Sequence, residues 1–233
     1  DDADGKEVLR IFAQEGVDTS GISIGTTPTA GSVIVASREH SARAISTRQP
    51  VVQAPINEAA KKLIASAQWL HVDHVGIKRL EEIGVSRGNG PQISFDAGYG
   101  VESFDPILVD LFVPTDRQMA HRYPGVDLAV ALENDSMKAG NTVVATQGSA
   151  GSAGFSPETG LVTAPGFKVE VTSTLGAGDV FHGALVAQLI QGHQLQEAMR
   201  RANAVAALSC RGLDGQSMIP TTIELDKYLE AHK

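Results

Sequence analysis

The chain has 233 residues, of which 42% are hydrophobic and 20% charged, as in an ordinary globular protein with a full core. The net charge of -8 comes without a basic stripe, which argues against a nucleic-acid partner. The single cysteine, Cys210, excludes an internal disulfide and lies in an Ala-rich helical pattern, so we expect a buried structural thiol. No apolar run is long enough for a membrane span and no secretory signal is visible, so we expect a cytoplasmic protein without a membrane partner.

The first part of the chain combines a helix with a hairpin. Apolar residues in the range 8–12 fall on one helical face, and Gly16 ends that helix. Two short strand-like runs, 33–36 and 42–45, flank a polar turn at 37–40. This pattern predicts an antiparallel hairpin.

From residue 56 onward, helical and strand patterns alternate. This alternation is typical of βαβ units, so we expect an α/β fold with a mostly parallel sheet flanked by helices on both faces. Ligands of such sheets bind beyond the carboxyl ends of the strands. The predicted strands are 69–75, 92–96, 142–146, 161–162 and 167–171, and 106–112 is mixed. The predicted helices are 59–67, 77–84, 128–139, 179–191, 195–208 and 224–231, and 148–154 is the most linker-like stretch.

The run Thr174-Leu175-Gly176-Ala177-Gly178-Asp179 joins a predicted strand to a predicted helix. A Gly-Ala-Gly turn at a helix start brings backbone N–H groups close to a ligand, and the helix dipole there favours an anion such as phosphate. A carboxylate repels phosphate, so Asp179 fits better as the proton acceptor for a hydroxyl nucleophile. An amide cradle beside a base predicts transfer of a phosphoryl group to an alcohol.

The segment 174–183 resembles the signature D-[ST]-x-G-A-G-D-x-F-x-G of the ribokinase-like (PfkB-type) carbohydrate kinases. The resemblance implies that the turn Gly176–Gly178 is an anion hole and that Asp179 is the catalytic base. It also implies ATP and Mg²⁺ as cofactors, with K⁺ as a further candidate. The first Asp of the signature corresponds to Ser173 here, which alters a structural or cation-linked contact and leaves the base in place.

Two further segments match the nucleotide site of the family. The run Thr146-Gln147-Gly148-Ser149-Ala150-Gly151 resembles a T-x-G-x-x-G turn beside the ATP phosphates and ribose, which implies cofactor-binding roles for Thr146, Gly148 and Gly151. Asn203, in an Ala-Asn-Ala sequence, matches an Asn beside the adenine pocket, and it fits equally well a helix residue with a local hydrogen bond. No G-x-x-x-x-G-K-[ST] sequence occurs, which argues against a Walker-type NTPase.

The sequence does not identify a metal site. The N-x-x-E pair with which the family orders water around Mg²⁺ is replaced by Thr115 and Gln118, neither of which is charged, although Asp116 between them can compensate. Asp96 ends a predicted strand where the family often has D-x-N, so a role near the substrate competes with a turn role.

Two histidines lie in the predicted strand 69–75. Strand alternation places His71 and Asp73 on one face and His74 on the other. Metal binding needs more converging ligands than these, so the pattern favours packing and a solvent-facing imidazole.

The first residues, Asp1-Asp2-Ala3-Asp4-Gly5-Lys6, are similar to a family segment G-D-D-x-x-G that follows the first strands. We therefore expect about fifty further residues to precede them in the protein. On this interpretation residues 1–233 form a single α/β kinase domain without its N-terminal strands, and residues 24–54 form a small β lid over the sugar. The exposed lid is also a candidate homodimer surface, and an ordinary surface hairpin fits the pattern equally well.

The predicted function is ATP-dependent transfer of the γ-phosphoryl group to a hydroxyl of a small sugar. One alternative is a kinase for another small alcohol, such as a nucleoside or a vitamin precursor, because the Gly-Ala-Gly-Asp core is common to all of these. The other is a non-catalytic nucleotide- or sugar-binding protein that kept the fold, as Ser173, Thr115 and Gln118 suggest.

Overall fold

The computed structural model describes residues 1–37, 42–48, 54–98 and 104–232. The chain divides into two compact units, Asp1–Ser66 and Ala67–Lys233.

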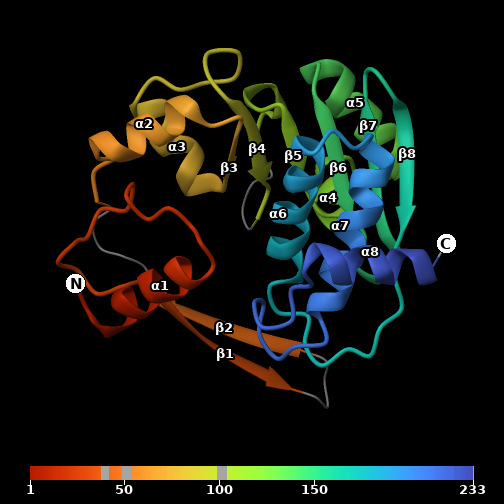
Figure 1. Ribbon diagram of the computed structural model, residues 1–233. Helices are drawn as coiled ribbons and strands as arrows, with labels where there is room; N and C mark the ends of the chain where they lie inside the picture. The colour runs from red at the N-terminus through yellow and green to blue at the C-terminus, as the bar shows by residue number, and fades with distance from the viewer. Residues whose placement is uncertain (38–41, 49–53, 99–103, 233) are drawn as a thin grey trace. The chain divides into compact units, whose positions relative to one another are not determined.

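The first unit contains two helices and a two-stranded sheet (Figure 1). Its elements are α1 (Ala3–Gln14), β1 (Gly31–Ser37), β2 (Ala42–Arg48) and α2 (Glu58–Ser66). β1 and β2 pair antiparallel, with Ile34 opposite Ile45, which confirms the predicted hairpin. Residues 38–40 of its predicted turn lie outside the described residues.

The second unit is built on a six-stranded sheet with the order β3-β4-β5-β6-β7-β8. The first four strands run parallel, and β7 and β8 are antiparallel to their neighbours, which confirms the prediction of a mostly parallel sheet. The strands are β3 (Trp69–Val72), β4 (Gln92–Asp96), β5 (Leu111–Val113), β6 (Thr142–Thr146), β7 (Gly151–Ser156) and β8 (Gly160–Pro165).

Helices cover both faces of this sheet. α6 and α7 lie on one face, and α4 and α5 pack on the other (Figure 1). The α-helices of the unit are α3 (His74–Glu82), α4 (Asp116–Arg122), α5 (Leu128–Ala139), α6 (Ala177–Ile190), α7 (Leu195–Ser209) and α8 (Thr222–Ala231), and the short 3₁₀ turns are η1 (Pro106–Leu108) and η2 (Gly148–Ala150).

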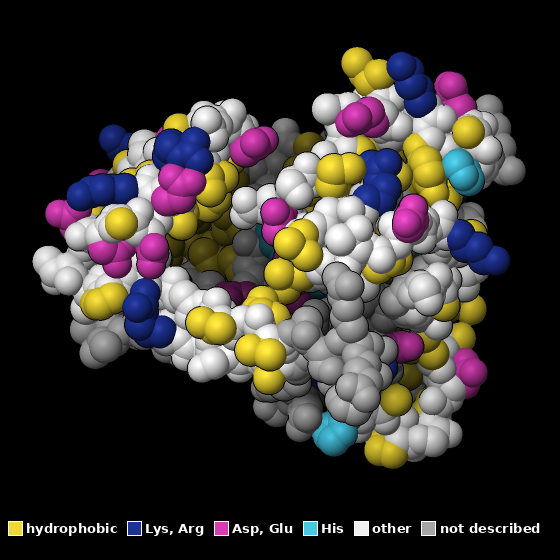
Figure 2. Space-filling view, turned by 90° about the horizontal axis from the view of Figure 1, so that it is seen from below, with side chains coloured by type: hydrophobic (Ala, Val, Ile, Leu, Met, Phe, Trp, Pro, Cys, Tyr) yellow, Lys and Arg dark blue, Asp and Glu magenta, His cyan; other side chains and the backbone are white. Residues whose placement is uncertain are grey.

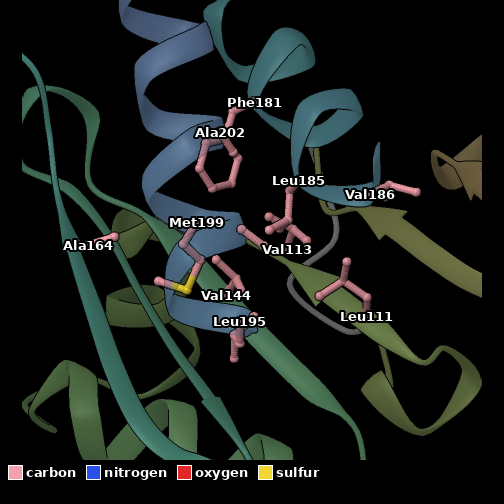
Figure 3. Close-up of a cluster of buried hydrophobic side chains, with 11 residues drawn as sticks. Leu111, Val113, Val144, Ala164, Phe181, Leu185, Val186, Leu195, Met199 and Ala202 are labelled. Carbon is pink, nitrogen blue, oxygen red and sulfur yellow. The ribbon is translucent and has the colours of Figure 1, made fainter. Parts of the chain in front are cut away.

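The largest core cluster fills the space between the sheet and the α6–α7 pair (Figure 3). Val113 of β5 and Val144 of β6 face Leu185 of α6 and Met199 of α7, and all four side chains are fully buried. Burying each such side chain contributes about 1.5–3 kcal/mol to folding. This packing fixes α6, and therefore its first turn, relative to the ends of the central strands.

Three secondary-structure predictions are wrong. The predicted strand 69–75 ends at Val72, because Asp73 caps α3 by accepting hydrogen bonds from the amides of Val75 and Gly76. Residues 167–171 form no strand, and their apolar alternation instead turns side chains toward a cavity. The linker-like stretch 148–154 contains η2 and most of β7.

The small residues of that stretch are explained by close packing. A Cβ atom on Gly154 of β7 would lie 3.0 Å from the sulfur of Met199 and 3.1 Å from a methyl group of Val144. β7 is therefore a buried strand whose small side chains let α7 approach the sheet.

Charged side chains of both signs are interspersed on the face of the molecule in Figure 2, where the described Lys and Arg residues form no continuous basic patch. Among the helices of the described ranges, none has both the length and the apolar character needed to cross a bilayer.

Candidate active site

A cavity of about 590 Å³ opens in the second unit beyond the carboxyl ends of β5 and β6. Thr115 follows β5, Thr146 ends β6, and a parallel bridge joins these two residues at the cavity wall. The volume is typical of small-molecule sites, which span about 300–1,000 Å³. The lining residues include Thr115, Asp116, Arg117, Thr146, Gly148, Gly151, Phe167, Val169, Val171, Thr174, Ala177, Gly178, Asn203, Ala206 and Cys210.

One end of the cavity is the first turn of α6. Gly176 is the N-cap of this helix, with φ of 74°, and no side chain caps the N-terminus. A Cβ on Gly176 would lie 2.7 Å from the Cα of Gly215, so both the left-handed backbone and the close approach of two chains require glycine here. The first i→i−4 hydrogen bond of the helix runs from Val180 N to Gly176 O. The amides before Val180 therefore have no acceptor within the helix.

The predicted anion hole and base lie together in this turn. Ala177 and Gly178 line the cavity, and the Ala177 amide donates a 3.3 Å hydrogen bond to the carbonyl of Thr174. Asp179, the next residue, is exposed, and neither it nor Gly176 is among the residues that line the cavity. Ser173, which stands in place of the Asp of the signature, accepts a hydrogen bond at Oγ from the amide of Leu175, 3.1 Å away.

The turn between β6 and β7 forms a second part of the wall. Its amides bond within the chain, since Gln147 N donates to Gly151 O at 2.8 Å and Ala150 N donates to Gln147 O at 3.1 Å. Gly151 has φ of 107°, and a Cβ there would lie 2.2 Å from the carbonyl oxygen of Ala164 in β8. Thr146, Gly148 and Gly151 are all lining residues.

Asn203 of α7 also lines the cavity, and it is 7% exposed. Its Nδ2 donates to Ser152 Oγ at 3.1 Å and to the carbonyl oxygens of Ala164 at 3.0 Å and Pro165 at 3.3 Å. The side chain therefore ties α7 to β7 and β8 at the position where it meets the cavity.

Thr115 and Gln118 form a capping box at the start of α4. Gln118 N donates to Thr115 Oγ1 at 3.2 Å, and Thr115 N donates to Gln118 Oε1 at 2.7 Å. The Gln118 side-chain amide also donates to the carbonyls of Ala97 and Gly98. Both side chains are thus engaged in local structure, and among the lining residues Asp116 is the one carboxylate.

A family model for the pfkB family carbohydrate kinases matches residues 1–222. This chain belongs to that family. The ribokinase of Haemophilus influenzae is 28% identical over 247 aligned residues, which cover 98% of this chain and 78% of the ribokinase. The chain is accordingly a carbohydrate kinase with a ribokinase-like α/β fold.

The solved structures that share this fold include two with bound small molecules. An Escherichia coli protein provisionally assigned as ribokinase II, solved with ATP and Mg²⁺, has a TM-score of 0.80 at 21% identity and covers 100% of this chain and 81% of its own. The nucleoside kinase of Burkholderia thailandensis, solved with inosine, has a TM-score of 0.77 at 18% identity and covers 98% of this chain and 77% of its own.

In this kinase, Asp96 lies at the end of β4 and makes two contacts. Its Oδ1 accepts a hydrogen bond from Gly98 N at 2.8 Å, the predicted turn role, and lies 3.5 Å from His182 Nε2. Burial lowers the pKa of His182 to about 4, against the opposing effect of the Asp96 carboxylate. Burial likewise lowers the pKa of His71, while the nearby charges of Asp96 and Asp179 act to raise it.

Some features of the site are not found by motif. Among the residues that line the cavity, Arg117 is the one with a positive charge. It lies between the motif positions Thr115 and Gln118, but the motif does not specify its identity. Phe167, Val169 and Val171 line the cavity from the segment that the sequence predicts as a strand. Gly215, against which Gly176 packs, lies 39 residues away in the chain. The only local signal is a second glycine, Gly212, in the same loop.

Proposed function

We propose that this carbohydrate kinase transfers the γ-phosphoryl group of ATP to a hydroxyl of a small sugar. The observation that carries the proposal is the juxtaposition at the start of α6. A cavity of about 590 Å³ ends at a helix N-terminus without a side-chain cap, and an exposed carboxylate, Asp179, follows in the same turn.

ATP would occupy the cavity with its phosphates toward α6. Apolar side chains such as Phe167 and Val171 fit the base, whereas Thr146, Gly148 and Gly151 give the nucleotide a close backbone wall. Arg117 supplies a positive charge for the phosphates. The E. coli protein of the same fold, solved with ATP and Mg²⁺, supports this donor.

Each part of the α6 turn has its own role in the proposed reaction. Asp179 accepts the proton of the sugar hydroxyl while the hydroxyl oxygen bonds to the γ-phosphorus and the bond to the bridging oxygen breaks, releasing ADP. The amides of Gly176, Ala177 and Gly178 stabilise the charge on the equatorial oxygens, and each well-placed donor is worth about 3 kcal/mol. The helix dipole of α6 adds to this stabilisation.

Asp116 is the residue that fits Mg²⁺, because it is the carboxylate of the cavity wall and hard cations prefer oxygen ligands. A Mg²⁺ ion bound with the nucleotide would neutralise phosphate charge. Thr115 and Gln118 add little to such a site, since their side chains are held in the α4 capping box.

An acceptor panel tests the proposal. ADP release is measured with ATP, Mg²⁺ and each of a set of pentoses, hexoses, nucleosides and pyridoxal-type alcohols, with and without K⁺. We expect turnover with a sugar. Turnover with nucleosides alone would instead favour the nucleoside alternative, for which the Burkholderia nucleoside kinase of the same fold is the supporting comparison. Nucleotide binding without turnover on any acceptor would contradict the proposal.

We also propose that the hairpin β1–β2 acts as a lid and joins two copies of the chain. Val33 and Val35 share one face of this two-stranded sheet and are 68% and 64% exposed, and Ile45, on the other face, is 52% exposed. Sedimentation velocity should give a dimer for the protein and a monomer for Val33→Lys/Val35→Lys. A monomeric protein at all concentrations would contradict the proposal.

A further inference from the structure

Three potential metal ligands from three separate elements meet beside the α6 face of the sheet. His71 lies in β3, Asp96 ends β4, and His182 lies in α6. One ligand atom of each side chain lies within 4.8 Å of the other two. No single stretch of sequence contains this cluster.

Strand register explains why they meet. His71 is directly opposite Ser94 in the parallel β3–β4 pair, so both side chains point to the same face, and Asp96 follows Ser94 by two residues on that face. Asp96 is in turn opposite Val113, whose side chain packs into the cluster formed with α6. His182 then reaches the two strand residues from the helix.

The contacts within the cluster leave histidine ring nitrogens able to bind an ion. His182 Nε2 lies 3.5 Å from Asp96 Oδ1, and the rings of His71 and His182 are 5.5 Å apart. His71 Nδ1 is 3.2 Å from the buried hydroxyl of Ser94. His182 is 6% exposed, and its Nδ1 has no hydrogen-bond partner among the described residues. Nε2, the atom that faces Asp96, is the ring nitrogen placed to bind an ion, whereas Nδ1 stays without a partner in the described part of the chain whether or not an ion is bound.

We propose that His71, Asp96 and His182 bind one divalent ion of the zinc type. In a tetrahedral site with bonds of about 2.0–2.2 Å, neighbouring ligand atoms are roughly 3.3–3.5 Å apart. The His182–Asp96 pair already has this spacing, and the exposed His71 ring can close the remaining distance.

The surroundings favour zinc over magnesium. A metal-bound histidine usually engages its second ring nitrogen in a hydrogen bond, and Ser94 holds Nδ1 of His71 so that Nε2 is left for the ion. Two imidazoles and one carboxylate suit Zn²⁺ or Co²⁺, whereas Mg²⁺ prefers oxygen ligands alone. Three protein ligands leave a fourth position for water.

The site would act on catalysis through Asp179, a consequence that rests on the proposed function. His182 is three residues after Asp179 on α6, and the charge of Asp179 already acts on His71. A dication in the cluster would stabilise the ionised form of Asp179 and weaken it as a base. Zn²⁺ is therefore expected to inhibit turnover.

Calorimetric titration of the chelator-treated chain with Zn²⁺ tests the site without using activity. We expect one strong site per chain and a loss of affinity of more than about 10–100-fold in His71→Gln, because losing even a group that only orients a metal ligand costs about that much. His71 is exposed, so the substitution should leave the fold intact. His74→Gln is the matched control, because His74 is exposed and lies outside the cluster.

Equal Zn²⁺ binding by the His71→Gln and His74→Gln variants, or no stoichiometric binding by the wild type, would overturn the site and leave a plain His–Asp contact. Asp96→Asn provides a second ligand variant, expected to weaken binding like His71→Gln. Inhibition of ADP release by Zn²⁺ in wild type and His74→Gln, and its loss in His71→Gln, would support the link to Asp179. Tight Zn²⁺ binding that leaves ADP release by the active enzyme unchanged would overturn the link to Asp179. If the metal-free wild type shows no turnover, that result contradicts the proposed function and not the zinc site.

Discussion

Two glycine-rich turns line the same cavity, but they differ in the element that follows and in the backbone groups that face the cavity. The turn at Gly176–Gly178 begins a helix of 14 residues and has no side-chain cap. The turn at Gly148–Gly151 connects two antiparallel strands, and its amides donate to carbonyls of the same connection. The first turn presents the N-terminus and the dipole of a helix, with the Ala177 amide also bonded to the carbonyl of Thr174, and the second presents a backbone wall.

This difference shows that a glycine pattern alone does not define an anion site. Gly176 and Gly151 are both required by positive φ and by a neighbouring backbone, Gly215 in one case and Ala164 in the other. Only at Gly176 does the required glycine also place a helix N-terminus at the cavity. On the proposed function, an anion site therefore depends on the helix that follows the turn and not on the glycines alone.

Gly176→Ala should have the largest combined effect. The added Cβ meets Gly215 and the backbone is left-handed, so we expect about 2–4 kcal/mol of destabilisation and a shift of the α6 first turn. Misplacement of reacting groups by about 1 Å costs on the order of 100-fold in kcat. Urea unfolding and turnover measure the two effects. Gly178→Ala is the matched control for stability, since its Cβ meets nothing within 4 Å, and a similar loss there would contradict the steric argument.

Gly151→Ala should destabilise by a similar amount, about 2–4 kcal/mol, because its Cβ would lie 2.2 Å from a carbonyl oxygen. The effect on the enzyme should differ, with a raised KM for ATP and a kcat within about threefold of wild type at a temperature where the variant is folded. A fall in kcat as large as that of Gly176→Ala would erase the distinction between the two turns.

The stability of the protein should fall as the pH drops from about 6.5 toward 4. Burial holds the pKa of His182 at about 4 in the folded state, below the value of 6.5 expected when it is unfolded. The unfolded state therefore binds a proton first, so stability present above pH 6.5 is lost through this window, on the order of 2–3 kcal/mol. Urea unfolding in the presence of a chelator measures the slope. His182→Gln should flatten it, and an unchanged slope would exclude this histidine as its source.

Asn203→Ala should have the smallest effect, about 1–2 kcal/mol, because it removes hydrogen bonds to Ser152 and Ala164 at a buried position. Ala202→Gly on the same helix removes a buried methyl group and lowers helix propensity without removing a polar contact, so it shows the cost of a non-polar change at a neighbouring buried position. Thermal unfolding compares the two variants. A loss in affinity for ATP with unchanged stability would show that Asn203 serves the nucleotide and not the β7–β8 pair.

Much of the fold could be predicted from local pattern. Helix α5 and strands β4 and β6 have the predicted bounds, since each is bordered by caps or polar turns that end the apolar pattern. Strand β7 has the composition of a linker because close packing against Met199 requires small side chains there. This contact is between distant segments, so no local pattern predicts it. The apolar alternation from Phe167 to Val171 is due to a cavity rather than to a sheet.

The positions of the candidate site residues in the fold are predictable where one motif contains them and not where distant segments meet. The motif places Gly176 to Asp179 in the first turn of α6, as the structure does. Gly215 and the convergence of His71 with His182 depend on long-range packing and on strand register. Asp73 is predicted to share a strand face with His71, but it is the N-cap of α3. An Asp directly before a helical pattern is a known N-cap signal and could have predicted this role.

The central claim is that Asp179 takes the proton of the acceptor while the α6 turn holds the transferred phosphate. Turnover and nucleotide binding of Asp179→Asn, measured side by side, test it most directly. We expect a loss of kcat of about 1,000-fold or more with an ATP dissociation constant within about threefold of wild type. Turnover near the wild-type level in this variant would contradict the account.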